Sequence, residues 1–221
     1  MNNPPFGVLR VLNDDLVQPH RGFGTHPHHN MEIVTYVVSG KLTHKDSMGT
    51  KETLGRGSIQ FMTAGSGIRH SEENNGDTPL RFIQTWITPT RRDLEPNYGS
   101  YPGSTNGPTN QLRHLVSNVR DTSTSTPVEI NQDVDGHAAE LELVETVTFD
   151  LPQARQAYLL CIEGTLEVNG TTVSKYDACE ITTGGEVSIK ATGVEDTENG
   201  QVAHFLMYSM KEVVGSGRKD L

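Results

Sequence analysis

The sequence predicts an all-β protein with two jelly-roll-like β-barrels in tandem and few short helices. Short apolar or alternating runs, bounded by Gly, Asn or Pro, recur along the 221 residues, and their β-branched and aromatic content is typical of strands. No long segment shows the 3.6-residue period of an amphipathic helix. The segment from Pro96 to Gln111 is rich in Pro, Gly, Ser, Thr and Asn, which is typical of a linker, and it divides the chain into two halves.

We therefore expect a first domain over residues 1–110, including the linker from residue 96, and a second over residues 111–221. The strands of the first domain are expected in EIVTYVVSG, KLTHKD, GSIQFMTAG and LRFIQTWITP. Those of the second are expected in AELELVETVTF, AYLLCIEGTLEVNG and VAHFLMYSM. Asn169-Gly170 stands between two alternating runs and predicts a hairpin with a type I′ turn. Closure into barrels would protect the strand edges.

The charge, cysteine content and hydropathy of the sequence exclude several classes of function. Lys and Arg number 18 against 28 Asp and Glu, so the formal charge of -10 argues against nucleic acid as a direct partner. Two cysteines are too few for a disulfide framework or a thiolate metal motif. No run approaches the roughly 20 apolar residues of a membrane span, and the N-terminus lacks the pattern of a signal peptide. We expect a cytoplasmic protein that binds no membrane.

The stretch GTHPHHNME holds three histidines in four positions. In an extended chain His26 and His28 share a face and His29 points away, whereas a helix would separate the first two and would not accommodate Pro27. Imidazole is a common ligand of borderline divalent metals. The spacing therefore predicts half of a metal site.

The other half is expected in GSGIRHSEEN, where His70 and Glu72 again share a face. Together the two pairs offer three nitrogens and one carboxylate, with coordination positions left for water, substrate or dioxygen. Glu32 lies an even number of residues from His28 and is a rival for the carboxylate position. His44 is interpreted either as a residue lining the pocket or as a histidine of the surface or outer shell. The second half of the chain has no matching cluster, so chemistry is expected in the first half.

At these residues the sequence resembles the pirin family, a branch of the cupin superfamily of small β-barrels. The matching stretches are GVLRVLNDD, GFGTHPHHNMEIVTYVVSG, LTHKDSMG, GSIQFMTAGSGIRHSEEN and LRFIQTWI. The resemblance implies that His26, His28, His70 and Glu72 bind one divalent metal ion, and it disfavours Glu32 as a ligand. It implies Fe(II), although this set of ligands also suits Mn, Co, Ni or Zn.

The resemblance to bacterial pirins implies a quercetin 2,3-dioxygenase that opens the ring of a flavonol, with a polyphenol and O2 as its small-molecule partners. We expect Glu72 to act in catalysis by taking the proton of the substrate hydroxyl. The alternative is a non-enzymatic, metal-dependent transcriptional co-regulator that binds another protein, as eukaryotic pirins do in the nucleus. A third hypothesis is a cupin isomerase or hydrolase that uses the metal as a Lewis acid without oxygen.

The sequence departs from the family at two places. His29 stands where arginine commonly follows the H-P-H motif. Relatives usually carry a longer segment before the stretch that matches GVLRVLNDD. We therefore expect the first barrel to lack an early strand and to have an edge open to pairing with another chain, in a monomer or weak homo-oligomer.

Overall fold

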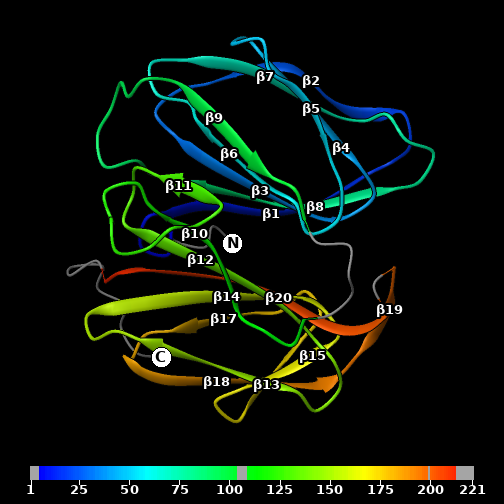
Figure 1. Ribbon diagram of the computed structural model, residues 1–221, viewed down its shortest axis with the longest axis vertical. Coiled ribbons are helices and arrows are strands. Elements are labelled where there is room, and N and C mark those ends of the chain that lie inside the picture. Colours follow the sequence, from blue (N-terminus) through cyan, green and yellow to red (C-terminus); the bar gives the residue numbers. More distant parts are fainter. Residues whose placement is uncertain (1–4, 104–108, 199, 213–221) are drawn as a thin grey trace. The chain divides into compact units, whose positions relative to one another are not determined.

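The computed structural model describes residues 5–103, 109–198 and 200–212, which form two compact units (Figure 1). The first unit contains residues 5–103 and 115–133, and the second contains residues 109–114 together with the described residues from 134 onward. Within the described residues every regular element is a strand, and the few short helices expected from the sequence are not found there. No helix in this part of the chain is long and apolar enough to cross a membrane.

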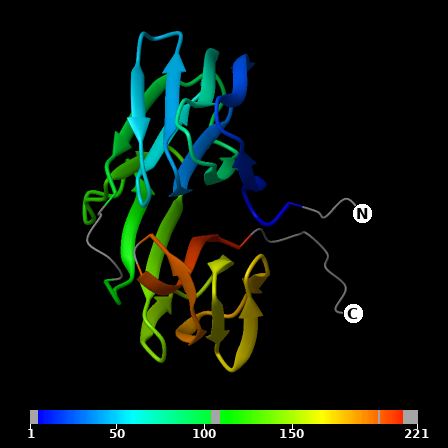
Figure 2. The same cartoon turned by 90° about the vertical axis from the view of Figure 1, so that its right-hand side faces the viewer.

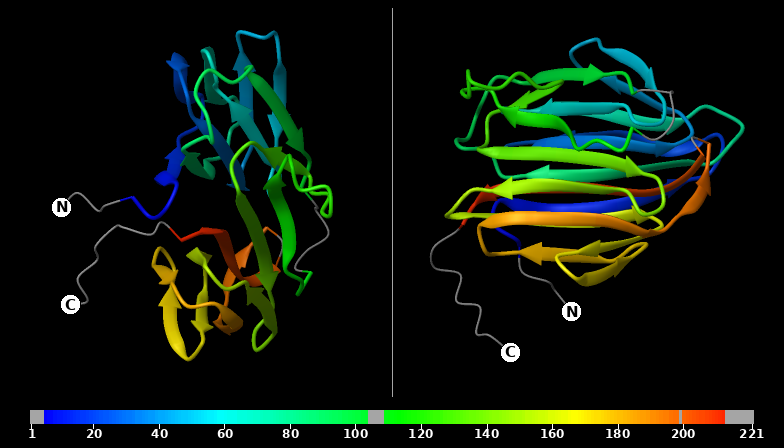
Figure 3. Two further views of the ribbon diagram at one scale, coloured as in Figure 1. Left: turned by 90° about the vertical axis from the view of Figure 1, so that its left-hand side faces the viewer. Right: turned by 60° about the horizontal axis from the view of Figure 1, so that its bottom comes forward.

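Two antiparallel sheets build the first unit. One has the strand order β1-β8-β3-β6-β9, formed by Leu9–Val17, Leu80–Ile87, Glu32–Ser39, Ile59–Thr63 and Asn97–Tyr101. The other has the order β2-β7-β4-β5, formed by Arg21–His28, Ile68–Asn74, Leu42–Asp46 and Lys51–Leu54. In Figures 2 and 3 the light-blue hairpin is β4 with β5. The unit also contains β11 (Val128–Ile130), which pairs in parallel with Val116, Ser117 and Asn118 of β10 (Arg113–Asn118).

The interior of the first unit lies between these two sheets. One apolar cluster joins residues of both sheets, namely Val17, Val37, Leu42, Leu54, Leu80 and Phe82. A second cluster consists of Ile33, Met62, Ala64 and Ile68, with Met31, Trp86 and Tyr98 packed against it. Alternation along each strand directs these side chains inward and leaves the intervening residues on the outer face or against neighbouring segments. Burial of these clusters holds the two sheets face to face.

The second unit repeats the strand order of the first. Its sheets read β12-β20-β14-β17 (Val134–Leu141, Gly200–Lys211, Arg155–Glu163 and Ala178–Ile181) and β13-β18-β15-β16 (Thr146–Leu151, Gly185–Gly193, Thr165–Val168 and Thr171–Ser174). A short strand, β19 (Glu195–Thr197), pairs with β20. If the strands of this unit are renumbered from 1 and β19 is left out, its two sheets have the orders 1-8-3-6 and 2-7-4-5. The sheets of the first unit have the same orders, with β9 added beside β6. The two predicted jelly-roll barrels are therefore confirmed.

The hairpin expected at Asn169-Gly170 is confirmed. Thr165–Val168 and Thr171–Ser174 pair antiparallel as β15 and β16, the yellow strands of Figure 2, and Val168 lies opposite Thr171. Both loop residues have positive φ, 48° at Asn169 and 82° at Gly170. A type I′ turn requires this conformation at both positions, and Asn and Gly adopt it at low cost.

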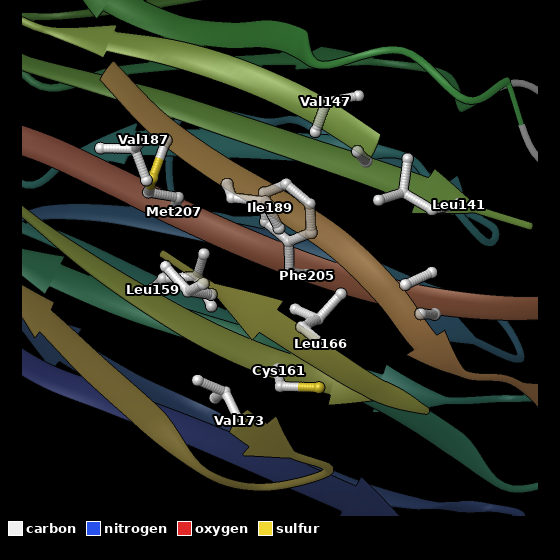
Figure 4. Packing of buried hydrophobic residues seen from close by; sticks show 14 of the residues in the cluster. Leu141, Val147, Leu159, Cys161, Leu166, Val173, Val187, Ile189, Phe205 and Met207 are labelled. Atoms are coloured by element: carbon white, nitrogen blue, oxygen red, sulfur yellow. The ribbon is translucent and has the colours of Figure 1, made fainter. Parts of the chain in front are cut away.

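Apolar side chains fill the interior of the second unit (Figure 4). The strand equivalent to β7 is β18, and it contributes Val187 and Ile189 to this core. The strand equivalent to β4 is β15, which contributes Leu166. Cys161 is buried in the same cluster, as expected of a small apolar side chain. Among the described residues, every grouping of three or more histidines and carboxylates suited to a metal lies in the first unit.

The segment expected to be a linker contains a strand. Asn97–Tyr101 forms β9 and pairs antiparallel with β6, with Tyr98 opposite Met62. The two tyrosines of NYGSY supply β propensity that the surrounding Gly, Pro and Ser obscure. The chain also returns to the first unit over residues 115–133, so the two units differ from the expected continuous domains at 1–110 and 111–221. The part of the segment at 104–108 lies outside the described residues.

Candidate metal centre

Two neighbouring strands place the predicted histidines on the inner face of the smaller sheet. In the pairing of β2 with β7, His26 lies opposite His70 and His28 lies opposite Ile68. Phe23 lies opposite Glu72. The step from Phe23 to His26 on β2 is three residues, whereas the matching step from Glu72 to His70 on β7 is two, so β2 contains a bulge. This bulge changes the alternation of β2 between Phe23 and His26. It allows both His26 and His28 to face His70.

The three imidazole rings converge. Their centroids lie 4.8 Å apart for His26 and His28, 4.5 Å for His26 and His70, and 4.9 Å for His28 and His70. Their ligand atoms lie within 4.8 Å of one another. The Nε2 atoms of His26 and His70 are 3.0 Å apart, about the separation of two adjacent ligands that each stand about 2.1 Å from one ion.

Hydrogen bonds determine which nitrogen of His26 is available. Its Nδ1 lies 2.7 Å from the carbonyl oxygen of Gly24, so Nδ1 carries the proton and Nε2 presents a lone pair. His28 Nε2 and His70 Nδ1 are buried and have no hydrogen-bond partner among the described residues. Unpaired buried nitrogen atoms are costly, and a bound metal ion would satisfy a nitrogen facing the cluster.

His28 and His70 are held in the neutral form that binds metals. Burial, followed by the charges of His26 and His29, lowers the pKa of His28 to about 4. Burial, followed by the charges of neighbouring histidines, lowers the pKa of His70 to about 3. Because a ligating imidazole must be deprotonated, both side chains are ready to bind a metal at neutral pH.

Glu72 is buried on the same face of β7, and glutamine side chains surround its carboxylate. Gln84 Nε2 donates to Oε2 at 2.7 Å, and Gln60 Nε2 donates to Oε1 at 3.0 Å. The pKa of Glu72 is raised to about 7, chiefly by burial; the charge of Asp15 adds to the rise, and the hydrogen bonds from Gln84, Thr35 and Gln60 oppose it. A carboxyl group with a pKa near neutrality can both take up and release a proton at physiological pH.

His44 lies beside this carboxylate on the neighbouring strand β4. It lies opposite Glu72 in the pairing of β4 with β7, and its Nε2 donates to Asp46 Oδ2 at 3.1 Å. Its ring stacks on Tyr98 at 4.3 Å, and its buried Nδ1 has no partner among the described residues. The ligand atoms of His44, His70 and Glu72 lie within 4.8 Å of one another. His44 is fully buried, so the surface position is excluded, and its hydrogen bond to Asp46 leaves it either lining the pocket or supporting the ligands from behind.

The predicted residues thus come together as two overlapping groups rather than one set of four. His70 belongs both to the group with His26 and His28 and to the group with His44 and Glu72. The hydrogen bonds from Gln60 and Gln84 hold the Glu72 carboxylate on the side of the larger sheet, which explains the division.

Glu32 lies outside both groups. Although it is fully buried, its carboxylate accepts hydrogen bonds from the backbone amides of Asn131 and Gln132 at 2.7 and 2.9 Å. The side chains of Asn131 and Thr63 also donate to it, at 3.0 and 3.3 Å. Burial raises its pKa, and these hydrogen bonds oppose the rise. Glu32 therefore anchors the segment 131–132 of the first unit.

His29 points away from the centre, as alternation predicts. It is exposed, and its Nδ1 lies 3.2 Å from the carbonyl oxygen of Ser66. Its ring is close to the backbone at Gly67, where an added Cβ would lie 2.8 Å from a ring carbon. The third histidine of the cluster thus packs against the loop before β7 rather than joining the other two.

Sequence reasoning missed three residues that contact the centre, namely Gln60, Gln84 and Trp86. Trp86 Nε1 donates to Gln84 Oε1 at 2.9 Å, and its ring meets the His28 ring edge-on at 4.9 Å. One signal was available in the sequence. Gln84 shares the inward face of its strand with Phe82 and Trp86 because it is two residues from each, and a polar residue on a buried face requires a polar partner.

The side chains present fit a divalent metal ion. Three imidazoles and one carboxylate are ligands of borderline ions such as Fe, Co, Ni and Zn. The fit rests on the converging rings, the short separation of the two Nε2 atoms and the unpaired nitrogen of His28. The first unit therefore contains a buried His/Glu site of the kind that binds a metal.

Comparison with known proteins gives matches along most of the chain. Residues 3–87 match the family model described as Pirin, and residues 115–198 match the model of the quercetinase C-terminal cupin domain. A pirin-like protein of Caulobacter vibrioides is 39% identical over 197 residues, which are 89% of this chain and 83% of that protein. Quercetin 2,3-dioxygenase of Escherichia coli strain K12 is 36% identical over 189 residues, or 84% of this chain and 78% of the enzyme.

A solved structure extends the likeness to three dimensions. The bacterial pirin YhhW from Escherichia coli, in its complex with nickel(II), superposes with a TM-score of 0.79 at 30% identity, covering 95% of this chain and 85% of that one. Both matched family models follow the order of the two barrels in this chain, and the first spans all the candidate ligands. The chain belongs to the pirin family.

Proposed function

We propose that the protein is a metal-dependent dioxygenase that cleaves the central ring of a flavonol such as quercetin. The observation that carries the proposal is the convergence of three imidazoles beside a buried carboxylate inside one barrel. The family membership supports an oxidoreductase-type role, and the E. coli relative bears the name of this activity. A polyphenol and O2 are the proposed small-molecule partners, and the cytoplasm is the proposed location.

The proposed ligands are His26, His28, His70 and Glu72, with one ion per chain and Fe(II) as the proposed metal. A divalent ion at this site would lower the pKa of a chelating hydroxyl and bring the resulting enolate together with dioxygen. Neutral His28 and His70 need not lose a proton before binding the ion. His26 is oriented by the Gly24 carbonyl, so that its Nε2 faces His70 Nε2 at the position proposed for the metal.

Glu72 is the proposed acceptor of the substrate proton. As a ligand of the proposed ion, its carboxylate would lie within reach of a substrate hydroxyl bound to the same ion and could take the proton of that hydroxyl. Gln84 and Gln60 keep the carboxylate directed into the barrel through both of its oxygens. In the net reaction, one molecule of O2 is consumed and one ring carbon leaves as carbon monoxide.

The test uses protein loaded with metal in the absence of oxygen. Quercetin is expected to shift its absorption on binding, and admission of air is expected to start oxygen uptake with release of carbon monoxide. His28→Gln should abolish both signals, whereas His29→Gln, a matched change on the exposed neighbour, should preserve them. A loaded wild-type protein that gives neither a spectral shift nor oxygen uptake would contradict the proposal.

A further inference from the structure

Trp86 contacts the candidate metal centre in two ways. Its ring meets the ring of His28 edge-on, at 4.9 Å and an interplanar angle of 86°. Its Nε1 donates a hydrogen bond of 2.9 Å to Gln84 Oε1. Through Gln84, which donates to Glu72 Oε2 at 2.7 Å, Trp86 is linked to the carboxylate as well.

The indole group determines which way the Gln84 amide faces. An indole N–H donates and cannot accept, so the amide oxygen must be the atom that faces it. The amide nitrogen then faces Glu72 Oε2. A reversed amide would set its NH2 group against the indole N–H and its oxygen against the carboxylate. Both contacts would be repulsive in this buried site, and the observed orientation is therefore locked.

In the described part of the chain, no donor-only group of this kind fixes the orientation of the amide of the second glutamine, Gln60. Gln60 Nε2 donates to Glu72 Oε1 at 3.0 Å, and Gln60 Oε1 lies 3.0 Å from the hydroxyl of Tyr98. The same hydroxyl also lies 2.9 Å from Glu52 Oε2. A hydroxyl both donates and accepts, so Tyr98 can satisfy either orientation of the Gln60 amide. The two glutamine side chains that donate to Glu72 therefore differ in how firmly their amides are oriented.

We propose that Trp86 is a positioning residue for Glu72 as a metal ligand, acting through the locked amide of Gln84. The proposal rests on the metal site proposed above. An ionised carboxylate has about four lone-pair directions, and the bond from Gln84 occupies one of those on Oε2. Fixing that bond fixes the plane of the carboxylate and the directions of the remaining lone pairs before the metal arrives. Residues that hydrogen-bond to a metal ligand typically contribute about 10- to 100-fold to metal affinity.

The chain offers a direct test because Trp86 is its only tryptophan. Biosynthetic replacement of tryptophan by benzothienylalanine exchanges the indole N–H for sulfur at this position alone and keeps the ring shape. Replacement by 5-fluorotryptophan keeps the N–H and serves as the matched control. Co(II) is the probe, with its dissociation constant measured by chelator competition and its ligand-field absorption spectrum recorded without substrate.

We expect the benzothienyl protein to bind Co(II) about tenfold more weakly than the wild type, to release it faster and to show an altered ligand-field spectrum. The fluorinated protein should match the wild type in all three. Gln84→Met should reproduce the benzothienyl result, whereas Tyr98→Phe, which also removes a donor behind a glutamine, should change the affinity less. The Tyr98 variant measures how far the loss of one buried hydrogen bond weakens Co(II) binding when the orientation of the Gln84 amide is kept.

Equal affinity and an unchanged spectrum for the benzothienyl and wild-type proteins would overturn the inference. So would an equal loss in the fluorinated protein, because the N–H would then not be the cause. If the wild type itself bound no Co(II), the proposed metal site would fail and this inference with it. The first two outcomes leave the metal site intact, so the two failures are distinguishable.

Discussion

Glu72→Gln is expected to stabilise the metal-free protein at pH 8 while removing a proposed metal ligand. Burial raises the pKa of this carboxyl from 4.5 to about 7. Between these values the folded chain retains a proton that the unfolded chain has released, so the contribution of Glu72 to wild-type stability falls as the pH rises through the window. The substituted amide carries no charge at any of these pH values, and the variant should not show this fall.

The size of the effect follows from the same shift. At about 1.4 kcal/mol per pKa unit, a rise from 4.5 to about 7 corresponds to about 3 kcal/mol of unfolding free energy lost by the wild type above pH 7. The substituted amide keeps one oxygen to accept from Gln84 and presents its NH2 group to Gln60, whose amide can reverse because the Tyr98 hydroxyl satisfies either orientation; we set the cost of this change at about 1 kcal/mol. The expected net gain at pH 8 is about 2 kcal/mol, and it should vanish near pH 4.5.

The assay is urea unfolding in the presence of a chelator, followed by tryptophan fluorescence at several pH values. Trp86 is the only tryptophan and lies in β8 of the first unit, so the signal reports that unit. With Ni(II) present the order should reverse, because the wild type would bind the ion more tightly than the variant. A metal-free variant less stable than the wild type at pH 8, or a gain that does not depend on pH, would refute the reasoning.

Three further outcomes are expected. Glu32→Gln should lower the unfolding free energy by about 2 kcal/mol, because the NH2 group of the new amide would face a backbone N–H donor. Elemental analysis of this variant should still find one metal ion per chain, and loss of the metal would make Glu32 a ligand. The contribution of His70 to the stability of the metal-free protein should be lost as the pH falls from 6.5 toward 3, because the unfolded chain protonates His70 before the folded chain does. In urea titrations over this range His70→Gln should therefore lose less stability than the wild type, and an equal change in both would contradict the assignment. Ni(II) should quench Trp86 fluorescence through its contact with His28, and His28→Gln but not His29→Gln should prevent quenching; equal quenching in both variants would place the ion elsewhere.

Alternation along strands was sufficient to predict much of the site. It placed His26 with His28, excluded His29 and paired His70 with Glu72, because side chains two apart in a strand share a face. It could not separate Glu32 from Glu72, since both lie at even spacings. The structure separates them by their partners, as backbone amides 99 and 100 residues away engage Glu32. Contacts between residues so far apart in the sequence cannot be predicted from the spacing of neighbouring residues.

Other features depended on pairing between strands. The bulge that brings His26 opposite His70 arises from the register of β2 against β7 and is not visible in β2 alone. The hairpin at Asn169-Gly170 was predictable because two adjacent residues determine it. The strand Asn97–Tyr101 was obscured by its loop-like composition, because pairing with β6 rather than intrinsic preference determines it. His44 was left open because only the β4–β7 register places it beside Glu72.

The most direct test is a crystal structure of the Ni(II)-loaded protein with anomalous diffraction recorded at the nickel edge. The proposed site predicts one anomalous peak per chain, about 2.0 to 2.2 Å from Nε2 of His26, His28 and His70 and from a carboxylate oxygen of Glu72. The protein also contains a second grouping of His44, His70 and Glu72, which offers the competing position. A peak bonded to His44 without His26 and His28, or a peak beside Glu32, would contradict the proposed centre.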